Sequence, residues 1–244
     1  MIAAFKSEIR NILTVRSTYG VLIATVVLLG FFAFFAQGIK ATPELLADKY
    51  AIANTFYEAI RVLSVVGALV GVMLVTHEYR YNTIVYTLTA SRSRVKVLAA
   101  KVLAVSVFAI LFTLLVCVIC PLFMLAGLAI NGGHLVPQTI PFADILWRVF
   151  FVGWGYSMLT SIIALLVRGQ VIAIIAVFMF PITVEPILGI VLKQNTKYLP
   201  FSALSSVGAN GGTLSPTRAA IVVMTYLLAG WIISAMLFRK RDAN

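Results

Sequence analysis

The sequence predicts an all-α polytopic membrane protein with six transmembrane helices. Hydrophobic residues make up 61% of the 244 residues and charged residues only 11%, and the mean hydropathy is +1.04. A bilayer core about 30 Å thick is crossed by about 20 apolar helical residues. Six runs approach or exceed this length with at most one charged residue each: 19–36, 59–76, 102–130, 149–167, 171–192 and 219–238. Too little of the chain is left for a soluble domain, so residues 1–244 are interpreted as a single transmembrane domain.

Residues 1–18 have the pattern of an amphipathic helix on the inner membrane surface. Lys6 and Arg10 fall on one side, and apolar residues recur every three or four positions on the other: Ile2, Phe5, Ile9, Ile12 and Leu13. Such a helix either orients the first span or offers a platform to a cytoplasmic partner. The first span is longer than the apolar core of a signal peptide and no small-x-small cleavage pattern follows it, so we expect it to be retained.

The distribution of basic residues predicts the orientation. With six spans both termini share a side, and that side also carries the segment 77–101 and Arg168. It holds 12 Lys and Arg residues against three acidic residues, whereas the other side holds seven against five. Because basic residues near span ends stay in the cytoplasm, both termini are expected inside. Membrane lipid therefore accounts for the basic charge, and no nucleic-acid partner is expected.

The segment 77–101, between the second and third spans, is more structured than a tether. Its apolar residues recur at helical spacing on either side of a small-residue break, which predicts a short helix, a turn and a basic start to the third span. These residues are Ile84, Val85, Leu88, Val95, Leu98 and Val102. Taken singly, the basic residues Arg92, Arg94, Lys96 and Lys101 are typical of anchors to anionic lipid.

Four features of this sequence resemble the type-2 ATP-binding-cassette (ABC) exporter permeases. They are Glu78-Tyr79-Arg80-Tyr81-Asn82-Thr83, Thr87-Leu88 followed by Ser91-Arg92-Ser93-Arg94, Lys101 at the start of the third span, and Phe238-Arg239-Lys240-Arg241-Asp242 at the end of the sixth. The sequence departs from the family pattern at Asn82, where the family usually has Gly, and at Ala90, where it often has Pro. The likeness extends over the whole chain.

This resemblance implies that residues 77–100 form a cytoplasmic coupling helix that docks on a nucleotide-binding subunit, aided by the N-terminal helix. The residues expected at that junction are Glu8, Arg10, Glu78, Tyr79, Arg80, Asn82, Thr83, Arg92, Arg94 and Lys101. The chain contains no G-x-x-x-x-G-K-[ST] motif, so it cannot cradle ATP phosphates itself. We therefore expect no cofactor in this chain, with ATP and Mg²⁺ bound by a separate P-loop ATPase.

The resemblance also implies that two permease chains, a homodimer or a pair with a close paralogue, meet through spans two and five around a transport path. A small-residue stripe in span two, including Ser64, Gly67 and Gly71, fits either this dimer contact or a contact within the chain. In span five, Pro181, Glu185 and Pro186 mark a broken outer half. Phe180, Pro181 and Glu185 are expected to lie on the transport path. Glu185 belongs either to an outer gate or to a structural cap or ion pair with Lys193, Lys197 or Arg148. The segment 193–218 contains an apolar stretch, Tyr198–Leu204, that fits a re-entrant external cap.

The resemblance implies a location in the plasma (inner) membrane and export of a hydrophobic or amphipathic substrate, such as a drug, a lipid or a lipid-linked product. An ion-coupled secondary transporter and a non-transporting scaffold that binds an ATPase are the alternatives. Catalysis in this chain is not expected, because His77 and His134 both lie in loops. Cys117 and Cys120 lie in the third span without His or acidic neighbours, so neither a metal site nor a disulfide framework is expected.

Overall fold

A computed structural model of the chain describes residues 5–7, 9–10, 16–80, 94–167, 169–209 and 213–240. Helices account for most of these residues and no strand occurs among them, which confirms the all-α class. The long segments are α2 (Arg16–Phe32) with the π-helix η1 (Ala33–Ile39), α4 (Ala51–Arg80), α6 (Arg94–Asn131), α7 (Phe142–Val167), α8 (Gln170–Met179) with η2 (Phe180–Val184) and α9 (Glu185–Leu192), and α11 (Pro216–Lys240). The short ones are α3 (Pro43–Ala47), the 3₁₀-helix η3 (Lys193–Tyr198) and α10 (Pro200–Gly208).

Five segments of the described chain are long and apolar enough to cross a membrane. They are Leu22–Ile39, Val97–Asn131, Phe142–Val167, Gln170–Tyr198 and Pro216–Leu237. These segments overlap five of the six predicted spans and are typical of a multi-pass membrane protein. The remaining prediction, 59–76, lies within the 30-residue helix α4, whose apolar section is Gly67–Thr76.

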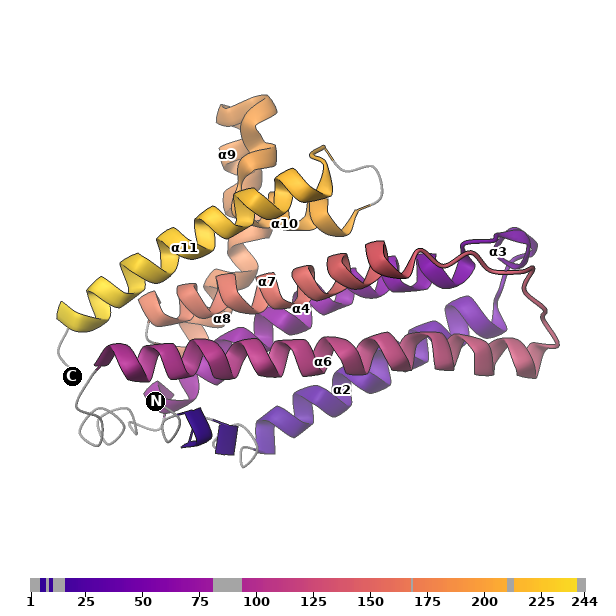
Figure 1. The fold of residues 1–244 in the computed structure, drawn as a ribbon, viewed down its shortest axis with the longest axis horizontal. Coiled ribbons are helices and arrows are strands. Elements are labelled where there is room, and N and C mark those ends of the chain that lie inside the picture. The colour runs from indigo at the N-terminus through magenta and orange to yellow at the C-terminus, as the bar shows by residue number, and fades with distance from the viewer. Residues whose placement is uncertain are drawn as a thin grey trace.

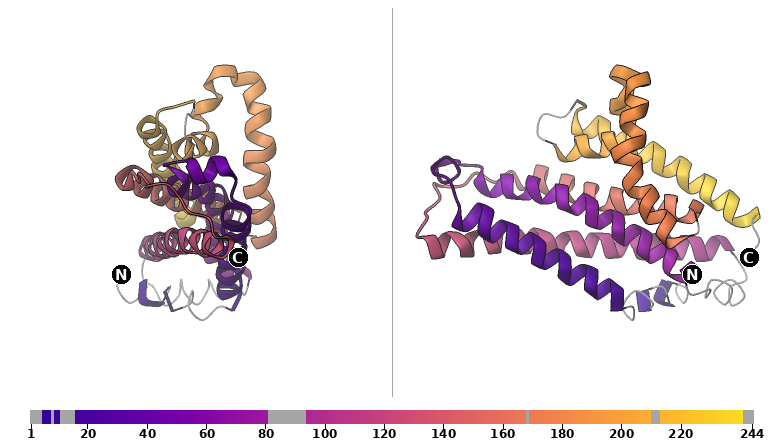
Figure 2. Two further views of the ribbon diagram at one scale, coloured as in Figure 1. Left: turned by 90° about the vertical axis from the view of Figure 1, so that its right-hand side faces the viewer. Right: turned by 180° about the vertical axis from the view of Figure 1, so that it is seen from behind.

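Four long segments run side by side, and the chain turns repeatedly at the end marked by α3. Figures 1 and 2 show α2, α4, α6 and α7 along the longest axis, whereas α11 crosses at an angle and α9 projects away from them. At the α3 end, hydrogen bonds join the segments 40–50 and 132–141. The Thr139 N–H donates to the Lys49 carbonyl at 2.8 Å, and Gln138 Nε2 donates to the Asp48 carbonyl at 3.1 Å. This end of the bundle is therefore closed by backbone pairing.

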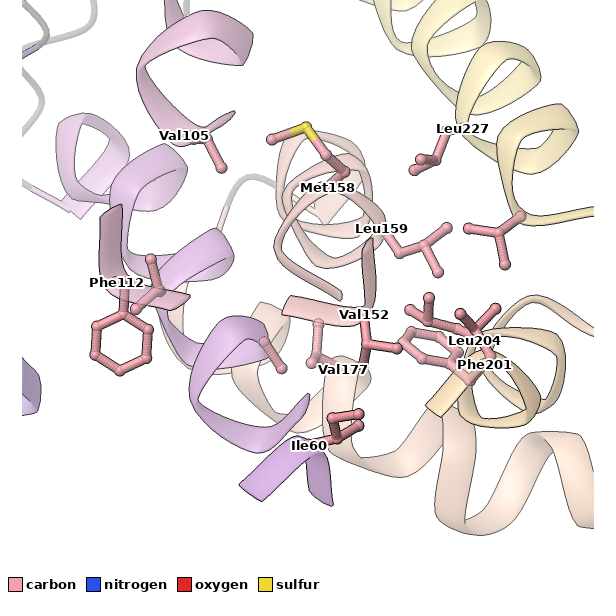
Figure 3. Close-up of a cluster of buried hydrophobic side chains, with 14 of the residues drawn as sticks. Ile60, Val105, Phe112, Val152, Met158, Leu159, Val177, Phe201, Leu204 and Leu227 are labelled. Atoms are coloured by element: carbon pink, nitrogen blue, oxygen red, sulfur yellow. The ribbon is translucent and has the colours of Figure 1, made fainter. Parts of the chain in front are cut away.

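The helix α7 forms the centre of the molecule. Its apolar window is 67% buried, against 17–39% for the other four candidate spans. The largest core cluster surrounds it, with contributions from α4, α6, α8, α10 and α11 (Figure 3). Each of the other four candidate spans therefore has a face that the described part of the chain does not cover, and these faces carry exposed apolar side chains such as Ile23, Leu111 and Ile232.

The helix ends that the sequence predicts to be cytoplasmic differ from the sequence-based boundaries. The helix α6 begins at Arg94 instead of residue 102 and has 38 residues, so it is about 57 Å long and extends well beyond a bilayer core. Residues 5–7 and 9–10 are helical, with Phe5 and Ile9 half-buried and Lys6 and Arg10 exposed, as the amphipathic pattern requires. The rest of the predicted N-terminal helix up to residue 15 lies outside the described residues, and residues 16–18 already belong to α2.

Candidate functional site

The fifth long segment is interrupted near its midpoint. The helix α8 ends at Met179, the five residues of η2 form a π-helical turn, and α9 begins at Glu185. Pro181 and Pro186 have no backbone N–H, so two carbonyl groups one turn earlier lose their usual helical partners. The break that the sequence predicted around Pro181 and Pro186 is thus present as a π-helical turn, whereas the residues that follow it form the regular helix α9.

The carboxylate of Glu185 caps the N-terminus of α10. Its Oε1 accepts a hydrogen bond from the Phe201 N–H at 2.8 Å, and its Oε2 accepts from the Ser202 N–H at 2.8 Å and from Ser202 Oγ at 2.5 Å. Pro200, the first residue of α10, has no N–H, and the Ala203 N–H donates to the carbonyl four residues earlier at 2.8 Å. Every backbone donor in the first turn of α10 is therefore satisfied.

The burial of Glu185 is explained by this cap. The side chain is only 3% exposed, and a carboxylate so far from water needs hydrogen bonds or an opposite charge to offset its desolvation. Two amides, a hydroxyl and the positive end of a helix dipole supply that compensation. Of the two sequence-based interpretations of Glu185, these contacts are those of a structural cap. Arg148, one of the partners considered for it, forms an ion pair with Asp144 instead, at 2.9 Å.

Aromatic side chains pack around the cap. The ring of Phe201, in the first turn of α10, lies 5.7 Å from the ring of Phe180 in η2 and 5.7 Å from that of Tyr156 in α7, centroid to centroid. These separations are typical of favourable aromatic pairs. Phe180, predicted from the sequence to line a transport path, is half-buried in this cluster. The cluster thus joins η2, α10 and α7 at one point.

The helix α10 is seated against the middle of α7. A Cβ on Gly155, which lies midway along α7, would approach Leu204 Cδ1 to 2.8 Å, and a Cβ on Gly208 would approach Ile60 Cγ2 of α4 to 2.6 Å. Figure 3 shows Phe201 and Leu204 of α10 directed toward Val152 and Leu159 of α7. The short helix therefore lies at mid-depth in the bundle. Gly155 and Gly208 allow it to approach α7 and α4 closely, and Glu185 holds its first turn.

The small-residue stripe of the second predicted span packs against α7 of the same chain. A Cβ on Gly67 would lie 3.0 Å from the Gly153 carbonyl, and a Cβ on Gly71 would overlap the Ser157 carbonyl and Thr160 Oγ1. Ser157 Oγ also donates a hydrogen bond to the Gly67 carbonyl at 3.0 Å. The close approach that Gly67 and Gly71 permit is therefore used within the chain and is not open to a second chain in this conformation. The side chain of Ser64 lies outside the described residues.

A polar cluster joins α4 and α7 at the α3 end. Asp144 accepts hydrogen bonds from Tyr57 Oη at 3.0 Å, Trp147 Nε1 at 3.3 Å and Arg148 Nε at 2.9 Å. Tyr57 lies in the first turns of α4, before the predicted span 59–76. The spacing of Asp144 and Arg148, four residues apart on a helix, could have been read from the sequence. Tyr57 could not, because it lies 87 residues away.

Replacing Tyr57 with phenylalanine is expected to lower stability by about 1.5 kcal/mol, the lower end of the range for a hydrogen bond to a charged group. The change removes only the hydroxyl, so the ring still packs beside Arg148. Thermal unfolding in detergent micelles, followed by size-exclusion fluorescence, measures the loss. Tyr50→Phe is the matched control, since Tyr50 is exposed. Equal melting temperatures for the two variants would contradict the expected role of the Tyr57 hydroxyl.

The residues predicted to contact an ATPase lie in different parts of the structure, and some lie outside the described residues. Glu78, Tyr79 and Arg80 form the last turn of α4, Arg94 is the first residue of α6, and Arg10 is exposed. Outside the described residues lie Glu8, Asn82, Thr83 and Arg92. Lys101 requires a correction: it is only 2% exposed, so its side chain is enclosed by the bundle and does not face a docked partner. A buried ammonium group requires a compensating polar interaction, which Lys101 has and which its position at a span end does not reveal.

No group of three or more His, Cys, Asp or Glu side chains that could hold a metal ion occurs in the described part of the chain. Cys117 and Cys120 are free thiols on α6.

Comparison with known families gives one match: a family described as "Protein of unknown function (DUF2705)" matches residues 17–243. No curated protein matches the chain.

Proposed function

The chain belongs to the DUF2705 family, whose description assigns no function, so its function has to be inferred from its own residues. We propose that it is the membrane-spanning subunit of an ABC exporter. Two such chains, identical or closely related, pair and bind two cytoplasmic P-loop ATPases. The ATPases bind ATP and Mg²⁺, and the permease moves a hydrophobic or amphipathic molecule outward.

The position of α10 supports this proposal more than any other observation. It lies between the fifth and sixth long segments and packs against the midpoint of α7. A short helix that reaches mid-depth and then returns to the start of α11 has the form of a re-entrant cap, which the resemblance to type-2 exporter permeases implies for the segment 193–218. Glu185 gives this cap a fixed attachment to the fifth segment.

We include α4 as the sixth span. Its 30 residues extend about 45 Å, enough to cross the bilayer core, and it packs along the central helix α7. With six spans, the end of α4, the start of α6 and the end of α11 all face the cytoplasm. The basic residues of the sequence are concentrated at those ends, which favours the same orientation in the plasma membrane.

The seam between α4 and α7 indicates how ATP binding could act on the path. The segment 81–93 follows α4 directly, so a partner that moves this segment also moves Arg80 at the helix end. Close backbone contacts at Gly67 and Gly71 join α4 to α7, and α7 carries α10. A shift at the cytoplasmic end therefore reaches the cap through packed helices, provided that the ATPase binds two arrangements of these helices with different affinity.

Affinity capture of the tagged chain from its native membrane in mild detergent tests the proposal. We expect a soluble P-loop ATPase in an amount equal to the chain, and we expect its loss when residues 81–93 are replaced by a Gly-Ser linker. The structure sets these limits, because α4 ends at Arg80 and α6 begins at Arg94, so the replacement leaves both helices intact. Point variants Glu78→Ala and Arg80→Ala should weaken capture, since charges at a docking surface steer association.

Glu44→Ala is the matched control for this capture. Glu44 lies on α3, at the opposite end of the bundle from Arg80, so its removal should leave ATPase recovery unchanged. Recovery of the folded chain alone, in repeated preparations of the unaltered protein, would contradict the exporter proposal and turn attention to an ion-coupled carrier. An ATPase captured equally by the 81–93 variant would place the docking surface elsewhere.

A further inference from the structure

The two halves of the fifth segment have different neighbours. The helix α8 packs against α4 and α7, with Ala173 and Val177 buried in the core. The extensive contacts of α9 are with η2 and η3, which flank it in sequence, and Figures 1 and 2 show it projecting from the bundle. Glu185 is the only buried residue of α9, and Ile190 and Val191 near its other end are each 77% exposed. The outer half of this segment thus depends on its first turn for attachment.

The turn η2 is a point where the helix can bend. A π-helical turn interrupts the regular i→i−4 hydrogen bonds, and Pro181 and Pro186 each remove a donor from the same stretch. Sharp bends in helices occur at prolines and π-bulges. Since α8 is fixed to the bundle and α9 is not, any bending at η2 moves α9 relative to the rest of the protein.

Two restraints on α9 remain: its continuity with η3, which packs on both α9 and α10, and the side-chain contacts of Glu185. The three hydrogen bonds of Glu185 cross from α9 to Phe201 and Ser202 of α10, which is itself seated on α7 and α4. We propose that α9 is a hinged arm: η2 is the hinge, and the Glu185 carboxylate is the latch that holds the arm to α10. Release of the latch lets α9 tilt relative to α10, with η3 moving as the continuous link between them. This hinge does not depend on the exporter proposal, because it requires neither an ATPase nor a substrate.

Distances between paired spin labels test the hinge in the full-length protein in lipid nanodiscs. Labels at Val191→Cys on α9 and Ile130→Cys on α6 report the arm, and labels at Val171→Cys on α8 and Ile130→Cys report the fixed half; all these sites are exposed. Cys117 and Cys120 are replaced by alanine in every sample. We expect Glu185→Gln to raise the population of a displaced arm about tenfold, because the amide replaces one acceptor oxygen with a donor that faces an N–H.

Two further variants separate the latch from the hinge. Ser202→Ala removes the hydroxyl contact but keeps both amide contacts, so the displaced population should rise less than in Glu185→Gln. Pro181→Ala restores a backbone donor in η2. It should narrow the distribution of Val191–Ile130 distances while the contacts of Glu185 stay intact. The Val171–Ile130 distances should stay constant throughout.

Unchanged Val191–Ile130 distances in folded Glu185→Gln protein would overturn the proposal. Equal broadening of both label pairs would also overturn it, because that result indicates general loosening of the bundle. If Glu185→Gln does not fold, Ser202→Ala and Pro181→Ala decide the matter: distances that respond to neither variant contradict the hinge.

Discussion

Replacing Gly71 with alanine is expected to force α4 away from α7 and to lower the free energy of unfolding by about 3 kcal/mol, the upper end of the range for overpacking. The added Cβ would overlap the Ser157 carbonyl and Thr160 Oγ1. The carbonyl belongs to the backbone of the central helix and cannot rotate aside. Relief therefore requires α4 to shift, and this pair of helices shares the most extensive contact among the described elements.

Three glycine-to-alanine variants form a graded series for this prediction. At Gly67 the new Cβ would lie 3.0 Å from the Gly153 carbonyl, a tight contact that small adjustments relieve, so a smaller loss is expected. At Gly20 nothing lies within 4 Å of the new atom, and alanine favours a helix, so no loss is expected. The melting temperature in detergent should be highest for Gly20→Ala, lower for Gly67→Ala and lowest for Gly71→Ala. If Gly71→Ala and Gly20→Ala have the same melting temperature, the described packing of α4 on α7 is wrong.

The helices could be predicted from the sequence because length and lack of charge suffice to identify a span. The partner of the small-residue stripe could not. Gly67 and Gly71 show how closely another helix can approach, but any helix with small residues fits, whether from the same chain or a second one. The stripe on α7 that meets them, Gly153 and Ser157, lies about 90 residues away in another span.

The candidate site was predicted in its residues but not in its contacts. Two prolines beside Glu185 indicate a broken helix with a buried carboxylate, which the structure contains. The partner of that carboxylate is a pair of backbone amides, and backbone amides have no signature in a sequence except, in hindsight, Pro200 as the first residue of a helix. Lys101 fails in the opposite way, since its position at a span end is typical of a surface anchor although its side chain is buried.

A second large effect is expected where α6 crosses η1. Gly127 of α6 lies against the Phe34 carbonyl, and its added Cβ would also lie 2.8 Å from the Cα of Gly38. The π-helical hydrogen bond from the Lys40 N–H to the Phe35 carbonyl, at 2.9 Å, holds this part of η1 in place. Gly127→Ala should therefore cost about 3 kcal/mol, because two backbones must separate.

The double variant of Gly38 and Gly127 provides the sharper test of this crossing. A Cβ on Gly38 would lie 2.7 Å from the Cα of Gly127, so either substitution opens the same gap. Once η1 and α6 have separated, the second methyl group enters space that already exists, and the double variant should melt close to the worse single variant. Gly127→Ala combined with Gly169→Ala, where the nearest atom is 3.6 Å from the new Cβ, should instead give additive losses. Additive losses at Gly38 and Gly127 would mean that the two residues do not face each other, and the first span would then have to pack on α6 in another register.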